Sequence, residues 1–346
     1  MVKVAIASYL PQDQVQRIEK LDPTIEVLYD PEVVPPPRWP GDHVGPSDWS
    51  PSPAQKERLL GMLAEAEVLY DFPREKGAPI PDLPALAPRL RWVQGSMAGA
   101  GEVAKRAGLL ESEVVVTTAS GVYSPYLAEF VLLAMLAHAK RLFRLQKDKA
   151  AKRWNEEPVD TLEGKTLCIV GLGNIGRAIA SRARPFGMHT TGVKRTVRED
   201  DPARGYADEL YATEDLHEAL SRADYVAVTL PATPETTRLI DRRAISVMRR
   251  GAYFINVGRG SVVDEGALVE ALREGHLSGA ALDVFETEPL PAGSPLWEMD
   301  EVIVSPHATD NVPEADRRQT DLFCENLRRY LAGEPLENQL DKRLLY

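Results

Sequence analysis

The sequence is poor in several residue types, and each shortage excludes a class of protein. It has only two cysteines in 346 residues, Cys168 and Cys324, which are too few for a disulfide framework and lack the spacing of a metal site. Aromatic residues make up 7% of the chain, and 41 basic residues stand against 52 acidic ones. The formal net charge of −11 argues against a nucleic-acid partner, because binding phosphates requires clustered lysine and arginine.

Long hydrophobic runs are also missing. The longest apolar stretch, Phe130 to Ala139, lies between Glu129 and Lys140 and is too short to cross a bilayer, so no membrane partner is expected. The first residues enter a strand-like run and show no signal-peptide pattern. Together with the apolar surroundings of Cys168, these features predict a cytoplasmic protein in a reducing compartment.

The chain does have enough length for two domains and a clear alternation of strands and helices. Up to about Ser120, short β-rich runs alternate with amphipathic segments of helical length, a pattern typical of βαβ units and a parallel sheet. The strands expected in this half are Val2–Ala7, Ile25–Tyr29, Val68–Asp71, Leu90–Val93 and Val114–Thr117.

One segment interrupts this alternation. Residues 31–53 carry eight of the 27 prolines, which fix φ and remove hydrogen-bond donors. We therefore expect a structured loop or an extended flap there. Two interpretations stay open: a surface insertion without chemistry, which is the commoner case, or a functional loop such as a lid.

A helical pattern from about Ser124 to Trp154 leads into a second alternating series. Ser124 supplies a capping hydroxyl, and Pro125 suits the first helical turn. Six strands are expected, at Thr166–Val170, His189–Lys194, Tyr225–Leu230, Ala252–Val257, Ala280–Val284 and Val302–Ser305. Six strands with intervening helices predict a doubly wound dinucleotide-binding fold, and the last helix, about Val312–Leu331, is expected to return to the first domain.

The predicted fold is therefore α/β, with two doubly wound parallel-sheet domains. A Rossmann dinucleotide-binding domain, residues 122–307, is inserted in a flavodoxin-like substrate domain, residues 1–121, and residues 308–346 return to that substrate domain.

A phosphate-binding loop follows the strand at Thr166–Val170. Gly171 allows the tight turn, Gly173 lets the backbone approach a pyrophosphate, and Gly176 lets helix and strand pack closely. Asn174 and Ile175 begin a helix whose N–H groups attract phosphate. A glycine-rich turn without a ligand is the alternative, but the strand–turn–helix context makes it the weaker one.

The end of the next strand indicates which dinucleotide binds. A dinucleotide fold of this kind often has a carboxylate there for the adenine ribose, whereas this chain has Lys194 and Arg195, with Arg198 shortly after. Cations at this place pair with a 2′-phosphate. We therefore predict NADP, with NAD possible, against the alternative that Lys194 and Arg195 are an ordinary solvated strand end.

Three further segments follow successive strands of the same domain and carry the candidate catalytic residues Arg259, Glu288 and His307. A guanidinium can clamp a carboxylate and polarise a 2-oxo group, and an imidazole can exchange the proton that accompanies hydride transfer. A neighbouring carboxylate orients an imidazole and favours its charged form. Each residue alone has an ordinary explanation, as an ion-pair partner, a loop carboxylate or a capping histidine, so their common sheet edge carries the argument.

Several stretches in order then make the chain recognisable. They are Trp92-Val-Gln-Gly-Ser-Met-Ala98-Gly99, Leu127-Ala-Glu-Phe-Val-Leu, Gly171–Gly176, Leu230-Pro-Ala-Thr-Pro-Glu-Thr, Ile255-Asn-Val-Gly-Arg-Gly, Leu282-Asp-Val-Phe-Glu-Thr-Glu-Pro-Leu, Pro306-His307 and the closing Asn326-Leu-Arg-Arg-Tyr-Leu-Ala-Gly-Glu-Pro-Leu-Glu-Asn. Over nearly its whole length the sequence resembles the D-isomer-specific 2-hydroxyacid dehydrogenases, most of all their glyoxylate/hydroxypyruvate reductase branch.

The resemblance implies a role for each matching residue. Arg259 would bind the carboxylate and carbonyl of the substrate, His307 would be the general acid/base, and Glu288 would be its partner. The remaining implied contacts are Ala98 and Gly99 for the substrate carboxylate, Asp283 for the nicotinamide carboxamide, and Leu230, Pro231 and Val257 for the cofactor site. The implied reaction is reduction of a short 2-oxo acid to a D-2-hydroxy acid with NADPH.

The resemblance also implies a homodimer built around the helix at Ser124–Trp154. Its apolar residues Leu127, Val131, Leu132 and Met135 exceed what one small domain face should need. A helix that bridges the two domains of a monomer is the alternative.

Other functions remain as alternatives. The same fold serves a dinucleotide-sensing corepressor branch, so a non-catalytic protein is possible. The formate dehydrogenase branch has an amide where this chain has Glu288, which argues against that activity. Hydrolase motifs such as GxSxG and HExxH are absent, and no metal site is expected. After His307 the sequence Ala-Thr-Asp-Asn-Val-Pro departs from the small, glycine-containing turn of the family.

Overall fold

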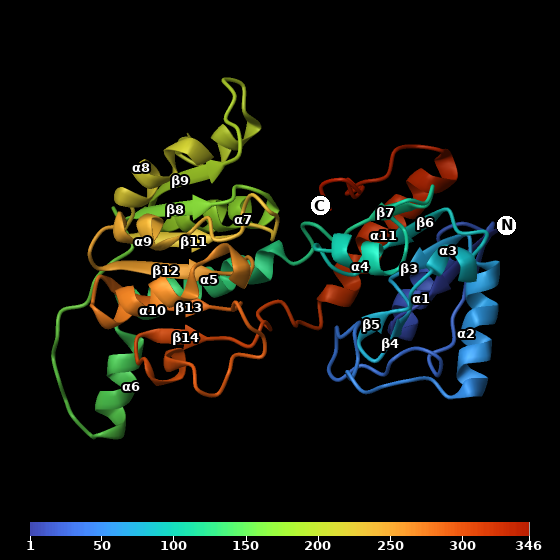
Figure 1. Cartoon of the computed structure of the whole chain (residues 1–346), viewed down its shortest axis with the longest axis horizontal. Coiled ribbons are helices and arrows are strands. Elements are labelled where there is room, and N and C mark those ends of the chain that lie inside the picture. Colours follow the sequence, from blue (N-terminus) through green and yellow to red (C-terminus); the bar gives the residue numbers. More distant parts are fainter. Residues whose placement is uncertain (346) are drawn as a thin grey trace. The chain divides into compact units, whose positions relative to one another are not determined.

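The computed structural model describes residues 1–345 and separates into two compact units (Figure 1). Unit 1 contains Met1–Tyr123 and the chain from Asn311 onward, and unit 2 contains Ser124–Asp310. Each unit has its own parallel sheet with helices packed on it, so the predicted α/β class with two parallel-sheet domains is confirmed.

Unit 1 is built on a five-stranded parallel sheet in the order β2-β1-β3-β6-β7. Its strands are β1 (Val2–Ile6), β2 (Ile25–Leu28), β3 (Val68–Tyr70), β6 (Trp92–Gln94) and β7 (Val115–Thr117). Its helices are α1 (Gln12–Glu19), α2 (Pro53–Glu65), α3 (Leu83–Leu86), α4 (Gly101–Arg106) and α11 (Ala315–Ala332). Apart from a two-stranded hairpin of β4 (Arg74–Glu75) and β5 (Ala78–Pro79), this is the flavodoxin-like order.

The C-terminal helix α11 completes the core of unit 1, as predicted. Phe323 and Leu327 of α11 are fully buried in one cluster with Tyr70 and Trp92 of the sheet. The rings of Trp92 and Phe323 stack with their centroids 5.1 Å apart. One face of the sheet is thus covered by a segment that is more than 200 residues away in the sequence.

The proline-rich segment forms a loop, as predicted, because no helix or strand occurs between residues 29 and 52. Within the loop, the buried carboxylate of Asp42 accepts two hydrogen bonds from Arg38, from Nε at 2.7 Å and from Nη2 at 3.1 Å. His43 is buried as well, and its Nε2 lies 3.0 Å from the Asp316 carboxylate on α11.

Unit 2 contains a seven-stranded parallel sheet in the order β10-β9-β8-β11-β12-β13-β14. Its strands are β8 (Thr166–Val170), β9 (His189–Lys194), β10 (Glu209–Ala212), β11 (Tyr225–Val228), β12 (Ala252–Asn256), β13 (Leu277–Leu282) and β14 (Val302–Val304). Its helices are α5 (Ser124–Ala139), α6 (Leu142–Ala150), α7 (Asn174–Ala183), α8 (Leu216–Ser221), α9 (Arg242–Ser246) and α10 (Glu265–Arg273). The order reverses between β8 and β11, which is the topological switch point of a Rossmann fold.

The prediction of six strands in unit 2 was wrong, because it missed β10. This strand pairs only with β9 and forms the edge of the sheet. Its four residues include the exposed Glu209 and have no fully buried member, so the sequence lacks the apolar signal of an interior strand.

The prediction of one helix from Ser124 to Trp154 was also wrong. The chain breaks after α5, where Arg141 takes a left-handed φ of 52°, and α6 then runs in a new direction. The sequence changes character at this point: α5 is apolar and largely buried, whereas α6 carries several charged residues and is mostly exposed. Within residues 1–345, no helix is both long and apolar enough to cross a membrane.

Candidate active site

The glycine loop between β8 and α7 fits a pyrophosphate. Gly171 has φ +106°, and a Cβ at Gly176 would stand 2.2 Å from the Gly171 carbonyl oxygen, so both positions require glycine. At Gly173 a Cβ would meet no heavy atom within 4 Å, so the loop opens to free space there. Gly173 is also the N-cap of α7 and offers no side chain to the first-turn N–H groups at Asn174 and Ile175. These N–H groups suit a phosphate.

At the end of β9, Lys194 and Arg195 do not form the simple pair of cations that the sequence suggested. Lys194 forms an ion pair with the buried carboxylate of Asp201, with Nζ 2.5 Å from Oδ2. The Lys194 hydrogen bond, followed by the Ala203 amide, lowers the pKa of Asp201 to about 2. Arg195 and Arg198 are exposed beside this pair. Lys194 therefore already has a partner within unit 2.

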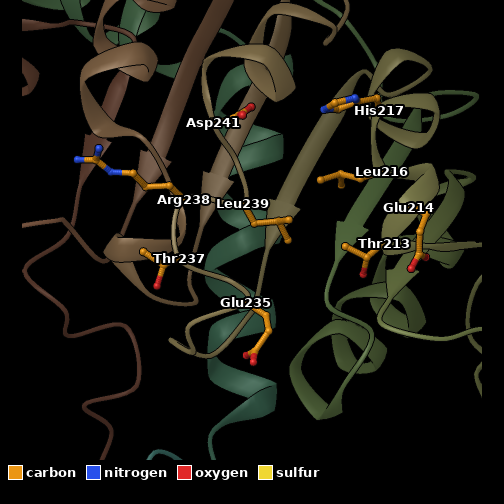
Figure 2. A pocket seen from close by; sticks show the side chains of 9 residues that line it. All are labelled: Thr213, Glu214, Leu216, His217, Glu235, Thr237, Arg238, Leu239 and Asp241. Atoms are coloured by element: carbon orange, nitrogen blue, oxygen red, sulfur yellow. The ribbon is translucent and has the colours of Figure 1, made fainter.

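A pocket of about 370 Å³ lies beside this strand end (Figure 2). Thr213, Glu214 and Leu216 line one side, and Glu235 and the segment 237–239 line the other. Thr213 donates a hydrogen bond to the Lys194 carbonyl at 3.4 Å, so the pocket is continuous with the end of β9. Sequence reasoning missed this pocket, because two of its walls come from segments that follow different strands.

Arg259 sits in a turn that follows β12 and is held by its own neighbours. The Asn256 side chain donates to the Arg259 carbonyl at 3.1 Å and accepts from the Gly258 amide at 3.0 Å. A Cβ at Gly258 would stand 2.6 Å from the Leu230 carbonyl oxygen, and one at Gly260 would stand 1.9 Å from that of Phe285. The two glycines thus bring three loops of the carboxyl edge of the sheet into direct backbone contact.

Glu288 and His307 are brought together by the loops that follow β13 and β14. His307 Nδ1 lies 2.9 Å from Glu288 Oε2, and the other oxygen, Oε1, accepts from the Phe285 amide at 3.0 Å. Both side chains are partly exposed, so the imidazole is oriented on one side and reachable from solvent. This arrangement can hold a proton on the imidazole and present it to a bound ligand.

Asp283 plays a larger structural part than the sequence suggested. Its buried carboxylate accepts four hydrogen bonds: from Ser305 Oγ at 2.6 Å, from the Ala308 and Thr309 amides at 3.0 and 3.3 Å, and from Thr309 Oγ1 at 2.7 Å. These donors flank His307, whose φ of +53° is unusual for a residue other than glycine. Asp283 therefore fastens the turn that carries the imidazole.

The structure adds Asp310, which sequence reasoning missed, to this group. Burial, reinforced by the charge of Asp283, raises the pKa of the Asp310 carboxyl above its usual range against the opposing influence of His307 and Arg259. The only sequence signal was the departure from a glycine-containing turn after His307.

The other predicted residues lie as follows. Val257 is buried under the Arg259 turn, and Leu230 and Pro231 follow β11 at the same sheet edge. Ala98 and Gly99 form an exposed turn after β6 of unit 1, and within residues 1–345 nothing accepts a hydrogen bond from their amides. Those two belong to unit 1, so their joint action with Arg259 stays a prediction. The described residues contain no cluster of three side chains able to hold a metal.

Comparison with known proteins gives a family match over half of the chain. Residues 132–309 match the model of the NAD binding domain of the D-isomer specific 2-hydroxyacid dehydrogenases. The chain is also 34% identical over 313 residues to the glyoxylate reductase of Aeropyrum pernix, covering 85% of this chain and 88% of that protein.

A second relative has a different activity and a greater length. The D-3-phosphoglycerate dehydrogenase of Methanocaldococcus jannaschii is 33% identical over 285 residues, which is 82% of this chain and 53% of that protein. The chain thus spans about half the length of that relative. Among solved structures, the NADPH-dependent glyoxylate/hydroxypyruvate reductase of Sinorhizobium meliloti, in complex with NADP and sulfate, is 25% identical with a TM-score of 0.79, and both chains are covered completely.

Proposed function

The chain belongs to the D-isomer-specific 2-hydroxyacid dehydrogenases, and from that premise we propose that it reduces short 2-oxo acids, of the glyoxylate and hydroxypyruvate type, to D-2-hydroxy acids with NADPH. The observation that carries the proposal is the Glu288–His307 pair, 2.9 Å apart, at the same sheet edge as Arg259 and the glycine loop. A dinucleotide-sensing protein without catalysis would not need an imidazole held in this way.

The residues divide the work of the reaction between them. When bound, a reduced nicotinamide would supply the hydride. His307 donates the proton to the carbonyl oxygen, and Glu288 keeps the ring oriented through its hydrogen bond to Nδ1. Arg259 binds the carboxylate and polarises the carbonyl, because a guanidinium offers parallel N–H donors. In unit 1, the Ala98 and Gly99 amides are the proposed donors to a substrate carboxylate.

The cofactor would lie along the carboxyl edge of the unit 2 sheet. The Gly171–Gly176 loop holds the pyrophosphate, the pocket of Figure 2 accepts the adenine, and Arg195 and Arg198 pair with the 2′-phosphate. Leu230, Pro231 and Val257 line the nicotinamide half. An NADP-containing relative with the same fold supports this placement.

The identity of the substrate needs a test of its own, because the relatives include both a glyoxylate reductase and a phosphoglycerate dehydrogenase. The test is a panel of 2-oxo acids with NADPH and with NADH, followed by the absorbance of the reduced nicotinamide. We expect turnover of glyoxylate and hydroxypyruvate, and a kcat/KM with NADPH about ten- to a hundredfold above that with NADH. No turnover of any 2-oxo acid would favour the dinucleotide-sensing alternative.

Substitutions at the end of β9 test the preference for NADPH over NADH. Replacing both Arg195 and Arg198 by serine should remove most of the preference for NADPH, while Lys194→Met should change it less because Lys194 is paired with Asp201. Equal use of both cofactors by the wild type would mean that these cations only face solvent.

We further infer a homodimer and a cytoplasmic location. Leu127, Val131 and Met135, which the sequence suggested for the dimer contact, are buried inside unit 2 and are not available. Other apolar residues are exposed on α5, α6 and the following loop: Leu133, Leu142, Leu145, Trp154 and Val159. Such a group suits a second copy of the chain. Both cysteines are buried and unbonded, as in proteins of reducing compartments.

A further inference from the structure

Two side chains of unit 1 donate hydrogen bonds to one backbone carbonyl near the start of α4. Tyr123, the last residue of unit 1 before α5, donates from its hydroxyl to the Ser96 carbonyl oxygen at 2.7 Å. Gln319, near the start of α11, donates from Nε2 to the same oxygen at 3.0 Å and also to the Tyr123 hydroxyl. A carbonyl oxygen has two lone pairs, so side-chain donors occupy both of them here.

Ser96 belongs to the short segment that leads from β6 to the Ala98–Gly99 turn. Its amide donates to the Asp71 carboxylate at 3.1 Å, and the next carbonyl, that of Met97, accepts from the Ala119 amide at 3.1 Å. A trans peptide unit is planar, so a fixed carbonyl also fixes the direction of the N–H group that follows it. Hydrogen bonds from three other segments of unit 1 therefore hold the chain up to the first amide of the turn.

The turn differs from the segment that leads to it. Ala98 and Gly99 are exposed, and within residues 1–345 their amides donate no hydrogen bond. Ser96 and Gln319 are buried, with 5% and 1% of their surface exposed. Free N–H groups at the end of a firmly held segment are preorganised for an anion, because they need no reorientation when it binds. How well these amides fit a carboxylate thus depends on the contacts that hold the buried segment.

We propose that Tyr123 and Gln319 are positioning residues, which hold the Ser96 carbonyl and so keep the Ala98–Gly99 turn in the conformation that binds the substrate carboxylate. The inference rests on the proposed function and adds to it two residues that act through the backbone. Sequence reasoning missed both, because they lie 27 and 223 positions from Ser96 and are brought to it by the fold of unit 1.

The test removes the two donors singly and together, in Tyr123→Phe, Gln319→Met and the double variant. Glyoxylate serves as substrate with saturating NADPH, and oxamate, a carboxylate next to an amide carbonyl, reports binding without turnover. Each single variant should raise the KM for glyoxylate and the dissociation constant of oxamate roughly three- to tenfold, the effect of one hydrogen bond, and the double variant roughly ten- to a hundredfold. The kcat and the KM for NADPH should change less than about twofold, since carboxylate binding is the same in the ground and transition states.

Tyr330→Phe is the matched control. Tyr330 also lies in unit 1, on α11, and its hydroxyl donates to Glu67 at 2.6 Å, so this variant loses a comparable hydrogen bond away from the turn. It should leave the KM for glyoxylate and the binding of oxamate as they are.

Two results would overturn the inference. One is a double variant with the wild-type KM for glyoxylate and the wild-type affinity for oxamate. The other is a parallel loss of Tm, kcat and affinity for NADPH, which would mark a purely structural role. Failure of the proposed function looks different, because the wild type then reduces no 2-oxo acid, and the binding of oxamate alone decides on Tyr123 and Gln319.

Discussion

The orientation of a single imidazole decides the first prediction. Glu288→Gln keeps the size of the side chain beside His307 but replaces a charge-assisted hydrogen bond to the imidazole by a weaker neutral one. In the direction of reduction, kcat should therefore fall about tenfold, with the KM for glyoxylate nearly unchanged. His307→Ala should lower kcat by roughly 10²–10⁴. A kcat that Glu288→Gln leaves unchanged would show that another group holds His307 in place.

Two glycines of the phosphate loop should respond differently to the same change. Gly173→Ala points a methyl group into open space on an extended backbone, so the Tm should stay within about 2 °C while the KM for NADPH rises. Gly176→Ala would place its Cβ 2.2 Å from the Gly171 carbonyl oxygen, so this variant should lose stability. Thermal melts and cofactor titrations of both variants decide the matter. Equal Tm losses would mean that Gly173 is structural and does not mark the cofactor's place.

The role of a single residue could be predicted from the sequence where the residues next to it in the chain define that role. The glycine loop is one case, because its spacing and its strand–turn–helix context are local. The pairing of Lys194 with Asp201 could not be predicted, since it depends on how the loop after β9 folds back on the end of the strand.

At the scale of elements, the turn that carries His307 is held by Asp283, and this leads to a prediction that separates two roles. If the main role of Asp283 is to hold the turn that carries His307, Asp283→Asn should lower kcat about tenfold or more. The dissociation constant for NADPH should then change little. The isosteric Thr309→Val, which removes one of the four donors, should show a smaller effect in the same direction. A large loss of NADPH affinity with kcat retained would instead favour the nicotinamide contact implied by the family resemblance.

The proline-rich loop should contribute a pH-dependent part of the stability. Burial alone would raise the pKa of Asp42, but the hydrogen bonds from Arg38, Val44 and Gly45 outweigh it and lower the pKa to about 2. A depressed pKa stabilises the fold above the unfolded value, near 4, and this contribution is lost as the pH falls toward 2. Asp42→Asn should therefore reduce the free energy of unfolding by on the order of 2 kcal/mol at pH 7 and by roughly half of that at pH 3.

Denaturant unfolding followed by tryptophan fluorescence at the two pH values measures this difference. Asp48→Asn, which changes an exposed carboxylate of the same loop, serves as the control and should have little effect. The same loss at pH 7 and pH 3 would point to the hydrogen bonds alone and not to the charge.

Among the elements, strands with an apolar run could be predicted even at the edge of a sheet, as β2, β7 and β14 were, and the edge strand without such a run could not. β8 and β9 were found at the bounds that the structure gives them, because both are apolar runs between turn residues. The edge strand β10 carries no such run, and the break between α5 and α6 follows from Arg141 in a left-handed conformation, for which the sequence has no glycine as a warning.

For the whole molecule, we predict a dimer of twice the 38.2 kDa chain mass in sedimentation at micromolar concentration. Leu145 is 51% and Trp154 is 92% exposed, and burying them against a second copy removes apolar surface from water. The double variant Leu145→Glu/Trp154→Glu should shift the protein toward the monomer, whereas Trp297→Glu, at an exposed site on a different segment, should not. A single 38.2 kDa species for the wild type would exclude the dimer.

The division of unit 1 between the two ends of the chain also determines the order of events during synthesis. The first 123 residues emerge long before α11, because the whole of Ser124–Asp310 is translated in between. At about 5–20 residues per second this interval lasts roughly 10–40 s. During that time Trp92 and Tyr70 have no Phe323 or Leu327 to cover them. The first 123 residues therefore wait with an open hydrophobic face while the inserted unit is made, and this is the stage at which a chaperone that binds apolar surface would find its target.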